Sequence, residues 1–297
     1  MRQDSDRVSK DVEGASAVIR WPSTVISGPI RSSCEGVVWL KSILVIDIDV
    51  LARELDEAVL GRREIEPLTR RHGFFDLKTA YAIQRAGLQL RAQRGERAVG
   101  YKLGFSSEAK RHQMDIATPI YGYLTDAMSV QERLVLAEGI HPRVEPEIAF
   151  VTASELRGDV TFEEALRACA AVAPALEILD SRFVGFKYFS VPDVIADDCS
   201  SWRFALGKHH GLCEVGDLLI RMSIDGRVVQ EARSSAISAH PVLSLVQLCA
   251  MLATHGQSLP AGSIVLAGGA TAAEPLKPGM RVSLEIESLG QVMLNVE

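Results

Sequence analysis

Two glutamates, Glu145 and Glu147, lie two residues apart in a segment that alternates in the way a β-strand does. Side chains at positions i and i+2 of a strand point to the same face, so the two carboxylates are neighbours. Adjacent carboxylates repel each other, and burying either without a partner is costly. A divalent cation would remove both costs, and oxygen ligands are those that Mg²⁺ and Mn²⁺ prefer. A solvated strand face is the alternative that the pattern leaves open.

A third glutamate, Glu177, interrupts the apolar run Pro174–Leu179. A carboxylate in such surroundings is rarely buried without a partner. Together the three glutamates could hold one octahedral ion and leave positions for water and substrate. The other interpretation is that Glu177 forms an ion pair with Arg182 or Arg203.

Lys102 stands between Gly100 and Gly104 in an apolar, strand-like segment. Glycine leaves room for a ligand to approach the backbone. A partly buried lysine has a lowered pKa and can take part in acid–base chemistry. A solvated surface lysine is the alternative interpretation.

Two turns that follow apolar segments could face a ligand. Asp197–Ser201 offers hydroxyl and backbone donors to a small acid, and is equally consistent with a helix cap or a tight turn. Gly268-Gly269 either faces a ligand or only reverses the chain, because it lacks the G-x-G-x-x-G spacing of a dinucleotide site. The histidines have no metal-ligand spacing, and no Walker, His-Glu-x-x-His or Gly-x-Ser-x-Gly pattern occurs.

The composition is typical of a globular protein. The chain has 297 residues, of which 47% are hydrophobic and 24% charged, and its net charge of -6 argues against a nucleic-acid partner. No uninterrupted apolar run reaches the roughly 20 residues that a membrane span needs. The 5 cysteines are odd in number and form no Cys-x-x-Cys pair, which argues against disulfides and zinc and favours a cytoplasmic location.

The elements that must position these residues fall into three parts. Residues 1–45 show no sustained period and predict a disordered extension. Residues 46–97 predict helices, the first capped by Asp49 and the second spanning about 76–94. Residues 98–297 predict a β-rich core that holds the metal and the catalytic groups.

Within that core, strands alternate with two helices. Pro146 predicts that the strand carrying Glu145 and Glu147 lies at a sheet edge or beside a bulge, because proline lacks the N–H that a central ladder needs. Thr161 and Glu164 form a capping box that opens a helix to about residue 172. The other expected elements are a strand at 175–179, a hairpin turn at 224–227, a helix at 241–255, and strands at 263–267, 281–287 and 292–296.

Several segments keep a recognisable order from about residue 48 to the C-terminus. They are Gly100–Gly104, Thr118–Gly122, His141–Phe150, Glu177–Arg182, Val194–Ser201 and Gly268-Gly269, with Pro275 and Gly279. Together they resemble the 2-keto-4-pentenoate hydratase and 4-oxalocrotonate decarboxylase family, within the fumarylacetoacetate hydrolase superfamily. The resemblance implies an α+β fold in which a helical N-terminal part precedes a rolled, barrel-like mixed β core.

The same resemblance implies a Mg²⁺ or Mn²⁺ ion on Glu145, Glu147 and Glu177. The ion would chelate a 2-oxo acid through its carboxylate and keto oxygens. Lys102 would lie close to the substrate as a catalytic residue, and Asp126 is a second acid–base candidate.

The resemblance also points to residues that bind the substrate. Ser200 or Ser201 would help to hold it. Asp198 stands where the family has Asn, and the added negative charge could alter substrate choice. A distal carboxylate would need a cationic partner, and three are available: Arg182, Lys187 and Arg203.

Two lyase reactions of aromatic catabolism compete within this family. A decarboxylase converts 4-oxalocrotonate (2-oxohex-3-enedioate) to 2-hydroxypenta-2,4-dienoate and CO2, and a hydratase adds water to that product. Thr118–Gly122 and Phe186–Ile195 resemble the decarboxylase branch, so decarboxylation is the predicted function.

Other functions are weighed against this one. An acylpyruvate-type C–C hydrolase would need a His–Glu dyad before Gly100, which the chain lacks, and the glutamates with Lys102 argue against a non-catalytic partner. The family further implies a homo-oligomer that can associate with a paired hydratase. The net charge and the lack of a long apolar run predict neither a nucleic-acid nor a membrane partner.

Overall fold

The computed structural model describes residues 46–297, apart from 108–110 and 113–115. The predicted disordered extension over 1–45 therefore lies outside the described residues. The helices are α1 (Ile48–Leu60), α2 (Leu68–His72), α3 (Leu77–Gln93), α5 (Phe162–Arg167), α6 (Val191–Ala196) and α7 (Pro241–Thr254). The longer strands are β1 (Ala98–Gly104), β2 (Ile120–Thr125), β5 (Arg143–Thr152), β6 (Cys169–Leu179), β7 (Ser201–Leu206), β8 (Leu219–Ile224), β9 (Arg227–Arg233), β12 (Arg281–Ile286) and β13 (Gly290–Val296). The short strands are β3 (Ser129–Val130), β4 (Arg133–Leu134), β10 (Ile264–Leu266) and β11 (Glu274–Pro275).

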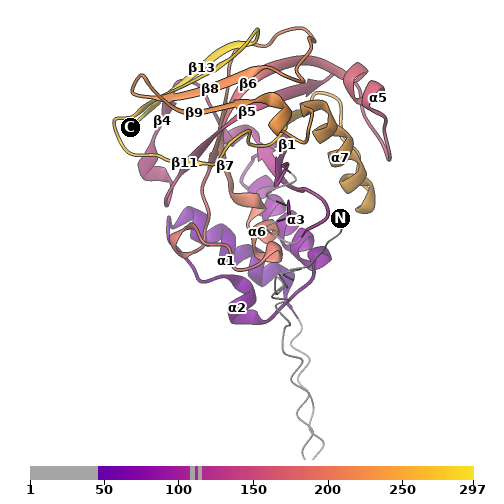
Figure 1. The fold of residues 1–297 in the computed structure, drawn as a ribbon. Helices are drawn as coiled ribbons and strands as arrows, with labels where there is room; N and C mark the ends of the chain where they lie inside the picture. Colours follow the sequence, from indigo (N-terminus) through magenta and orange to yellow (C-terminus); the bar gives the residue numbers. More distant parts are fainter. Residues whose placement is uncertain (1–45, 108–110, 113–115) are drawn as a thin grey trace, which may run out of the picture. The chain divides into compact units, whose positions relative to one another are not determined.

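Two mixed sheets form the β core (Figure 1). The larger sheet has the strand order β2-β1-β10-β5-β6-β7-β3, with β11 also pairing with β5, and the smaller has the order β4-β13-β12-β8-β9. Strands β12 and β13 contact β6, which brings the smaller sheet against the larger one. Most pairs are antiparallel, but β1–β10, β3–β7 and β4–β13 are parallel. The predicted α+β fold with a mixed β core is confirmed.

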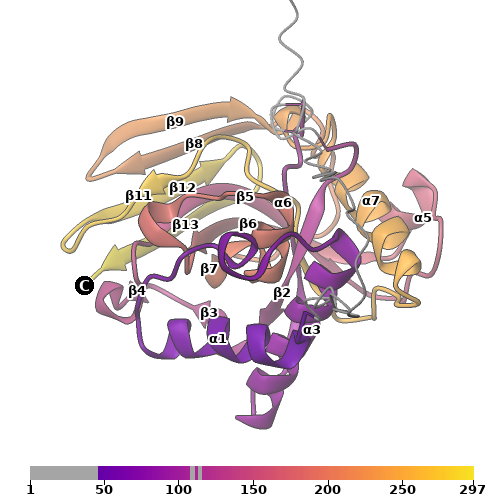
Figure 2. The same cartoon turned by 90° about the horizontal axis from the view of Figure 1, so that it is seen from below.

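Helices α1, α3 and α6 pack together on the side of the larger sheet away from the smaller one (Figures 1 and 2). Helix α1 buries an apolar stripe that includes Leu51 and Leu55. Its cap is Asp47, whose carboxylate accepts a hydrogen bond from the Val50 N–H at 3.1 Å. The prediction of Asp49 as the cap is therefore wrong by half a turn, because Asp49 already lies in the first turn of the helix.

Strand β5 lies in the middle of the larger sheet, between β6 and the pair β10 and β11. The prediction of a sheet edge or a bulge at Pro146 is wrong, because β5 is central and its register with β6 shifts only between Val151 and Thr152. The Pro146 carbonyl accepts a hydrogen bond from the Ala270 N–H at 3.1 Å, in the interval where β10 has ended and β11 has not begun. The missing N–H of Pro146 faces this opening, so a central strand accommodates the proline.

Helix α5 begins at the predicted capping box, in which Thr161 and Glu164 exchange hydrogen bonds. It ends at Arg167 rather than near residue 172, because β6 begins at Cys169 and continues the ladder with β5. Tertiary pairing therefore overrides the helical pattern of this segment. The predicted hairpin between β8 and β9 and the long helix α7 are present.

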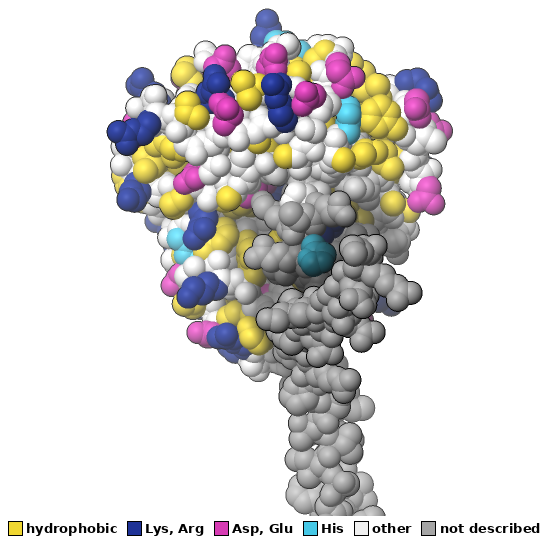
Figure 3. Space-filling model, in the orientation of Figure 1, with side chains coloured by type: hydrophobic (Ala, Val, Ile, Leu, Met, Phe, Trp, Pro, Cys, Tyr) yellow, Lys and Arg dark blue, Asp and Glu magenta, His cyan; other side chains and the backbone are white. Residues whose placement is uncertain are grey.

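The described surface carries charges of both signs. Figure 3 shows Lys and Arg side chains interspersed with Asp and Glu over the visible face of the sheets. The stretch Ser234–Thr254 is apolar and long enough to cross a membrane by length and composition, but 50% of its 18-residue apolar segment is buried within the fold. Helix α7, which makes up most of this stretch, packs against α5 as a core helix does.

Candidate active site

Three glutamates meet on the facing sides of two neighbouring strands. Glu145 of β5 pairs in register with Glu177 of β6, and Glu147 lies two residues further along β5 on the same face. Each residue offers a carboxylate oxygen, and these oxygens lie within 4.8 Å of one another. Their exposed fractions are 9% for Glu145, 0% for Glu147 and 1% for Glu177. The structure thus brings together the three residues that the strand pattern singled out.

The donor set fits a divalent cation. Glu147 Oε1 and Glu177 Oε2 are buried, and within the described residues neither has a hydrogen-bond partner. Burial, with the Glu177 charge adding to it, raises the pKa of Glu147 well above its usual range. Such a cluster is costly unless positive charge enters it. Carboxylate oxygens in this arrangement are the ligands that Mg²⁺ or Mn²⁺ prefers.

Lys102 of β1 supplies one positive charge to the cluster. Its Nζ lies 2.9 Å from Glu177 Oε1, and the side chain is 3% exposed. Glu177 is therefore paired with Lys102, and neither Arg182 nor Arg203 takes that place. Burial opposes the charge on Lys102, but Glu177 outweighs it and raises the Lys102 pKa above its ordinary value. The predicted lowering of this pKa is wrong, because the carboxylates hold the ammonium form.

A glycine turn after β10 reaches the carboxylates from the opening beside Pro146. The Gly268 N–H donates to Glu147 Oε2 at 2.7 Å. A Cβ atom at Gly269 would lie 2.3 Å from Glu145 Oε2, so a larger residue would displace that carboxylate. The turn therefore faces the site, and glycine lets its backbone approach the carboxylate without moving it.

A cavity of about 330 Å³ adjoins the glutamates. Its wall is largely apolar or aromatic, and its described cations are Lys102 and Arg143. The guanidinium of Arg143 lies 4.6 Å from the centre of the Phe186 ring. Arg143 belongs to the segment His141–Phe150 that carries the family resemblance, and its position two residues before Glu145 places it on the same strand face, a signal from which its place at the site could have been predicted. The lining residues are Lys102, Leu103, Gly104, Phe105, Ser106, Ile120, Arg143, Glu145, Leu179, Phe186, Tyr188, Val194, Cys199, Gly269, Ala272 and Ala273.

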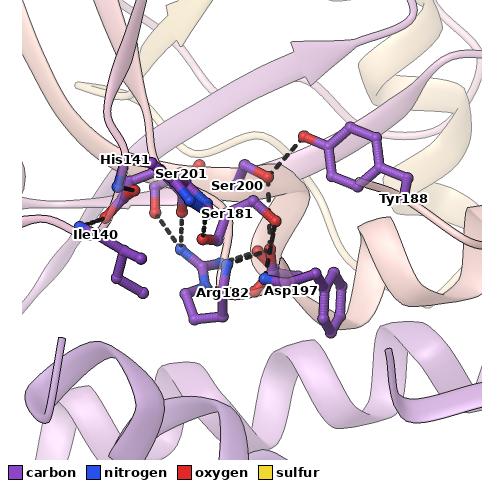
Figure 4. A network of polar contacts seen from close by, with 10 residues as sticks. Ile140, His141, Ser181, Arg182, Tyr188, Asp197, Ser200 and Ser201 are labelled. Carbon is purple, nitrogen blue, oxygen red and sulfur yellow. Dashed lines mark hydrogen bonds and ion pairs between the residues drawn. The ribbon is translucent and has the colours of Figure 1, made fainter. Parts of the chain in front are cut away.

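The turn that carries Ser200 and Ser201 lies behind this wall. Asp198, Cys199 and Ser200 all have left-handed backbone conformations, with φ values of 50°, 51° and 60°. The Ser200 hydroxyl lies 2.7 Å from the Tyr188 hydroxyl, and the side chain of Ser201 is buried (Figure 4). Neither serine is among the described residues that line the cavity, but Ser200 contacts Tyr188, which does.

Arg182 and Asp197 form a buried ion pair below the same turn (Figure 4). The Arg182 guanidinium also donates to the carbonyls of Asp180, at 2.7 Å, and Ser201, at 3.2 Å. The N–H groups of this guanidinium therefore bind other parts of the protein, and Arg182 does not line the described cavity. The structure gives Arg182 a supporting position in place of the predicted contact with substrate.

Asp198 faces the helices and not the cavity beside the glutamates. Its carboxylate accepts a hydrogen bond from the Tyr123 N–H at 2.8 Å. Burial raises its pKa, and the nearby positive charge of Arg91 opposes that shift. Asp198 and Arg91 line a separate small cavity against α1 and α3, so any influence of Asp198 on substrate passes through the turn that it begins.

Asp126 lies at the far end of the β1–β2 pair. Lys102 is opposite Gly122, whereas Asp126 follows Thr125, which is opposite Ala98. The Asp126 carboxylate accepts hydrogen bonds from the N–H and the side chain of Arg97, both at 2.9 Å. The structure does not bring Asp126 to the described cavity, and its contacts are those of a residue that fixes a turn.

Comparison with known proteins identifies relatives over most of the chain. A family model described as fumarylacetoacetate (FAA) hydrolase C-terminal matches residues 91–297. A 4-oxalocrotonate decarboxylase of Pseudomonas sp. is 44% identical over 248 residues, which cover 82% of this chain and 96% of the relative. A 2-hydroxyhexa-2,4-dienoate hydratase of Comamonas testosteroni is 33% identical over 251 residues, covering 82% and 95%.

A solved structure gives the same result for the fold. The 4-oxalocrotonate decarboxylase from Pseudomonas putida G7, complexed with magnesium and adipate, matches with a TM-score of 0.82 and 33% identity, covering 84% of this chain and 97% of that one. These findings confirm the resemblance and the lyase class, and the magnesium of that complex agrees with the predicted cofactor. The chain belongs to the fumarylacetoacetate hydrolase family, in which its relatives are decarboxylases and hydratases of 2-oxo and 2-hydroxydienoic acids.

Proposed function

We propose that this protein decarboxylates 4-oxalocrotonate (2-oxohex-3-enedioate) to 2-hydroxypenta-2,4-dienoate and CO2 with the help of a divalent cation. The observation that carries the proposal is the cavity lined by Glu145 and Lys102, where Glu145 belongs to the cluster of three carboxylates and Lys102 pairs with Glu177. The 44% identity to a 4-oxalocrotonate decarboxylase over almost the whole relative supports this choice of substrate.

In this proposal, Glu145, Glu147 and Glu177 hold Mg²⁺ or Mn²⁺. The ion supplies a Lewis acid for the carboxylate and keto oxygens of a 2-oxo acid. Lys102 stays protonated beside Glu177, so its ammonium is placed to stabilise negative charge that develops on the oxygen at carbon 2.

The reaction breaks the bond between carbons 5 and 6, and carbon 6 leaves as CO2. The electron pair of that bond forms the double bond between carbons 4 and 5, and the original double bond moves between carbons 2 and 3. The negative charge arrives on the oxygen at carbon 2, which takes up a proton to give the dienol. Apolar side chains such as Leu179 and Val194 keep the cavity wall poor in water, which strengthens the electrostatic contribution of Lys102.

The remaining predicted site residues have indirect roles in this proposal. Ser200 positions Tyr188, while Arg182 supports the turn that follows Asp197. Asp198 begins that turn and lines the small cavity against α1 and α3. These residues keep the cavity wall in place and do not carry the chemistry.

A hydratase that acts on 2-hydroxypenta-2,4-dienoate is the second candidate. It is favoured by the 33% identity to the Comamonas testosteroni hydratase, and the same carboxylates and Lys102 would serve it. We further propose a cytoplasmic homo-oligomer, which can associate with a paired hydratase, because the product of one reaction is the substrate of the next.

The test is to incubate purified protein and Mg²⁺ with 2-oxohex-3-enedioate, and to follow CO2 release together with the absorbance of the dienol. We expect CO2 release that EDTA abolishes and added Mg²⁺ restores. Release of CO2 that persists in EDTA would contradict the role of the cation. Consumption of 2-hydroxypenta-2,4-dienoate without any CO2 from the diacid would assign the hydratase.

A further inference from the structure

We propose that Arg143 binds the distal carboxylate of the substrate and makes the site selective for dicarboxylic over monocarboxylic 2-oxo acids. The inference rests on the proposed function, because it assumes a 2-oxo acid whose first two carbons lie at the glutamates. It goes further by naming the residue that binds the other end of the substrate.

The three cations that the sequence offered for this task lie elsewhere. Arg182 is engaged by Asp197 and by backbone carbonyls. Arg203 pairs with Glu138 at 3.2 Å. Lys187 is exposed and is not among the described residues that line the cavity.

The strand itself sets the distance between the two ends of the site. Arg143, Glu145 and Glu147 occupy positions i, i+2 and i+4 of β5, so all three side chains leave the same face. Alternate residues of a strand are about 6.6 Å apart. Carbon 2 and carbon 6 are joined by four bonds of about 1.5 Å each, and the zigzag of an extended chain shortens their separation to about 5 Å. A six-carbon diacid anchored beside Glu145 therefore reaches the neighbourhood of the Arg143 guanidinium.

The Arg143 side chain is prepared for an anion. It is half-buried and lies against the face of Phe186 at 4.6 Å, and no described carboxylate forms an ion pair with it. Stacking orients a guanidinium without using its N–H donors, which leaves them available for two parallel bonds to a carboxylate.

Phe186 is itself held in place. Its ring lies 5.2 Å from the His141 ring and 5.8 Å from the Tyr188 ring, and the preceding Gly185 N–H donates to Glu64 Oε1 at 2.8 Å. The orientation of Arg143 therefore depends on a packed aromatic group and not on a mobile surface contact.

This placement predicts how Arg143 divides its effect between binding and rate. The distal carboxylate is the group that leaves as CO2, so its negative charge moves away from the guanidinium during the reaction. A contact that is strongest before the reaction stabilises the bound substrate and does not raise kcat. We therefore expect Arg143→Gln to raise KM for 2-oxohex-3-enedioate about 10–100-fold, the size typical of a lost charge-assisted hydrogen bond, with a much smaller change in kcat.

The experiment uses two ligands that differ only at carbon 6, namely 2-oxohexanedioate and 2-oxohexanoate. Binding of each to the full-length, Mg²⁺-loaded protein is measured by calorimetry for wild type, Arg143→Gln, Arg143→Lys and the control Lys187→Gln. Wild type is expected to prefer the diacid. Arg143→Gln should weaken diacid binding about 10–100-fold and change binding of the monoacid less than about 2-fold. Arg143→Lys should lie between the two, and Lys187→Gln should match wild type.

Three results would overturn the inference. They are equal binding of both ligands by wild type, an equal loss of both in Arg143→Gln, and a loss of diacid preference in Lys187→Gln instead. The monoacid also reports on the integrity of the site, because it needs the glutamates but not Arg143. If wild type binds neither ligand in Mg²⁺, the proposed function itself fails, and the inference fails with it.

Discussion

Replacing Glu147 by glutamine removes a charge from the carboxylate cluster without removing a hydrogen bond. Glu147 is 0% exposed, and its Oε2 accepts the Gly268 N–H at 2.7 Å. Its Oε1 has no partner within the described part of the chain. Glutamine has the same size and keeps a carbonyl oxygen for Gly268, so the variant isolates the effect of the charge.

The substitution should change stability in opposite directions with and without the cation. In EDTA, wild type carries a buried group whose penalty is about 1–3 kcal/mol, so Glu147→Gln should be more stable by a similar amount. For a protein of this size 1 kcal/mol corresponds to about 2–4 °C in Tm. At 100 times its Kd, a bound ion adds about 2.7 kcal/mol, or about 5–10 °C, to wild type. Glu147→Gln should lose most of that rise, because the ion loses a charged ligand.

The pH dependence of stability in EDTA is a second measure of the cost of the buried Glu147 charge. Burial raises the pKa of Glu147 above the usual 4.5, so the folded protein binds this proton more tightly than the unfolded chain does. The corresponding stability is present below pH 4.5 and is lost as the pH rises through the raised pKa. The advantage of Glu147→Gln over wild type should therefore grow from acidic to neutral pH.

Thermal unfolding by calorimetry, in EDTA and in saturating MgCl2, tests these statements. Glu138→Gln is the matched control, because Glu138 pairs with Arg203 outside the described cavity lining. The reasoning is refuted if Glu147→Gln melts below wild type in EDTA, or if it keeps the full Mg²⁺-dependent rise. The first result would mean that the cluster tolerates its charge without a cation, and the second that the ion does not need the Glu147 charge.

Three further substitutions test the neighbours of the cluster. Lys102→Met removes the ammonium that lies 2.9 Å from Glu177, so kcat should fall about 100-fold or more while the Mg²⁺-dependent rise in Tm remains. An unchanged kcat would exclude Lys102 from the chemistry. Gly269→Ala places a Cβ atom 2.3 Å from a carboxylate oxygen of the site, so the Mg²⁺ affinity measured by calorimetry should fall about 10–100-fold. A wild-type affinity would contradict the close approach of Gly269 to Glu145. Arg182→Met leaves Asp197 buried without its partner, so the free energy of unfolding measured by urea denaturation should fall by about 3–5 kcal/mol. A loss below about 1 kcal/mol would contradict a buried ion pair.

Local sequence patterns were sufficient to predict that the carboxylates of the site are neighbours, but not which cation pairs with them. Strand alternation alone places Glu145 and Glu147 on one face, and the apolar run around Glu177 signals a buried carboxylate. The partner of Glu177 could not be read in the same way. Lys102 arrives from β1, which lies two strands away from β5 and reaches it only through β10. Such a contact depends on sheet order, and no spacing in the chain encodes it.

The same distinction explains the errors in the fold. The pattern of residues 161–172 predicts one helix, but its last part belongs to strand β6, because it forms backbone hydrogen bonds with β5. Asp47 and Asp49 are both good capping residues, and the choice between them depends on where the apolar stripe of α1 meets α3. In both cases the local options are close in energy, and packing decides between them.

Pro146 connects the register of β5 with the chemistry of the site. A slip of one residue would turn Arg143, Glu145 and Glu147 to the opposite face, so the site exists only in one register. The turn after β10 stabilises that register from the opening beside β5, where it contacts the Pro146 carbonyl and the Glu147 carboxylate. Any other residue at 146 would direct an N–H into this opening, where β10 no longer supplies a partner, whereas proline has none to leave unpaired. Pro146, which by sequence predicts a sheet edge or a bulge, is thus the residue that lets a central strand open where the glycine turn reaches the carboxylates.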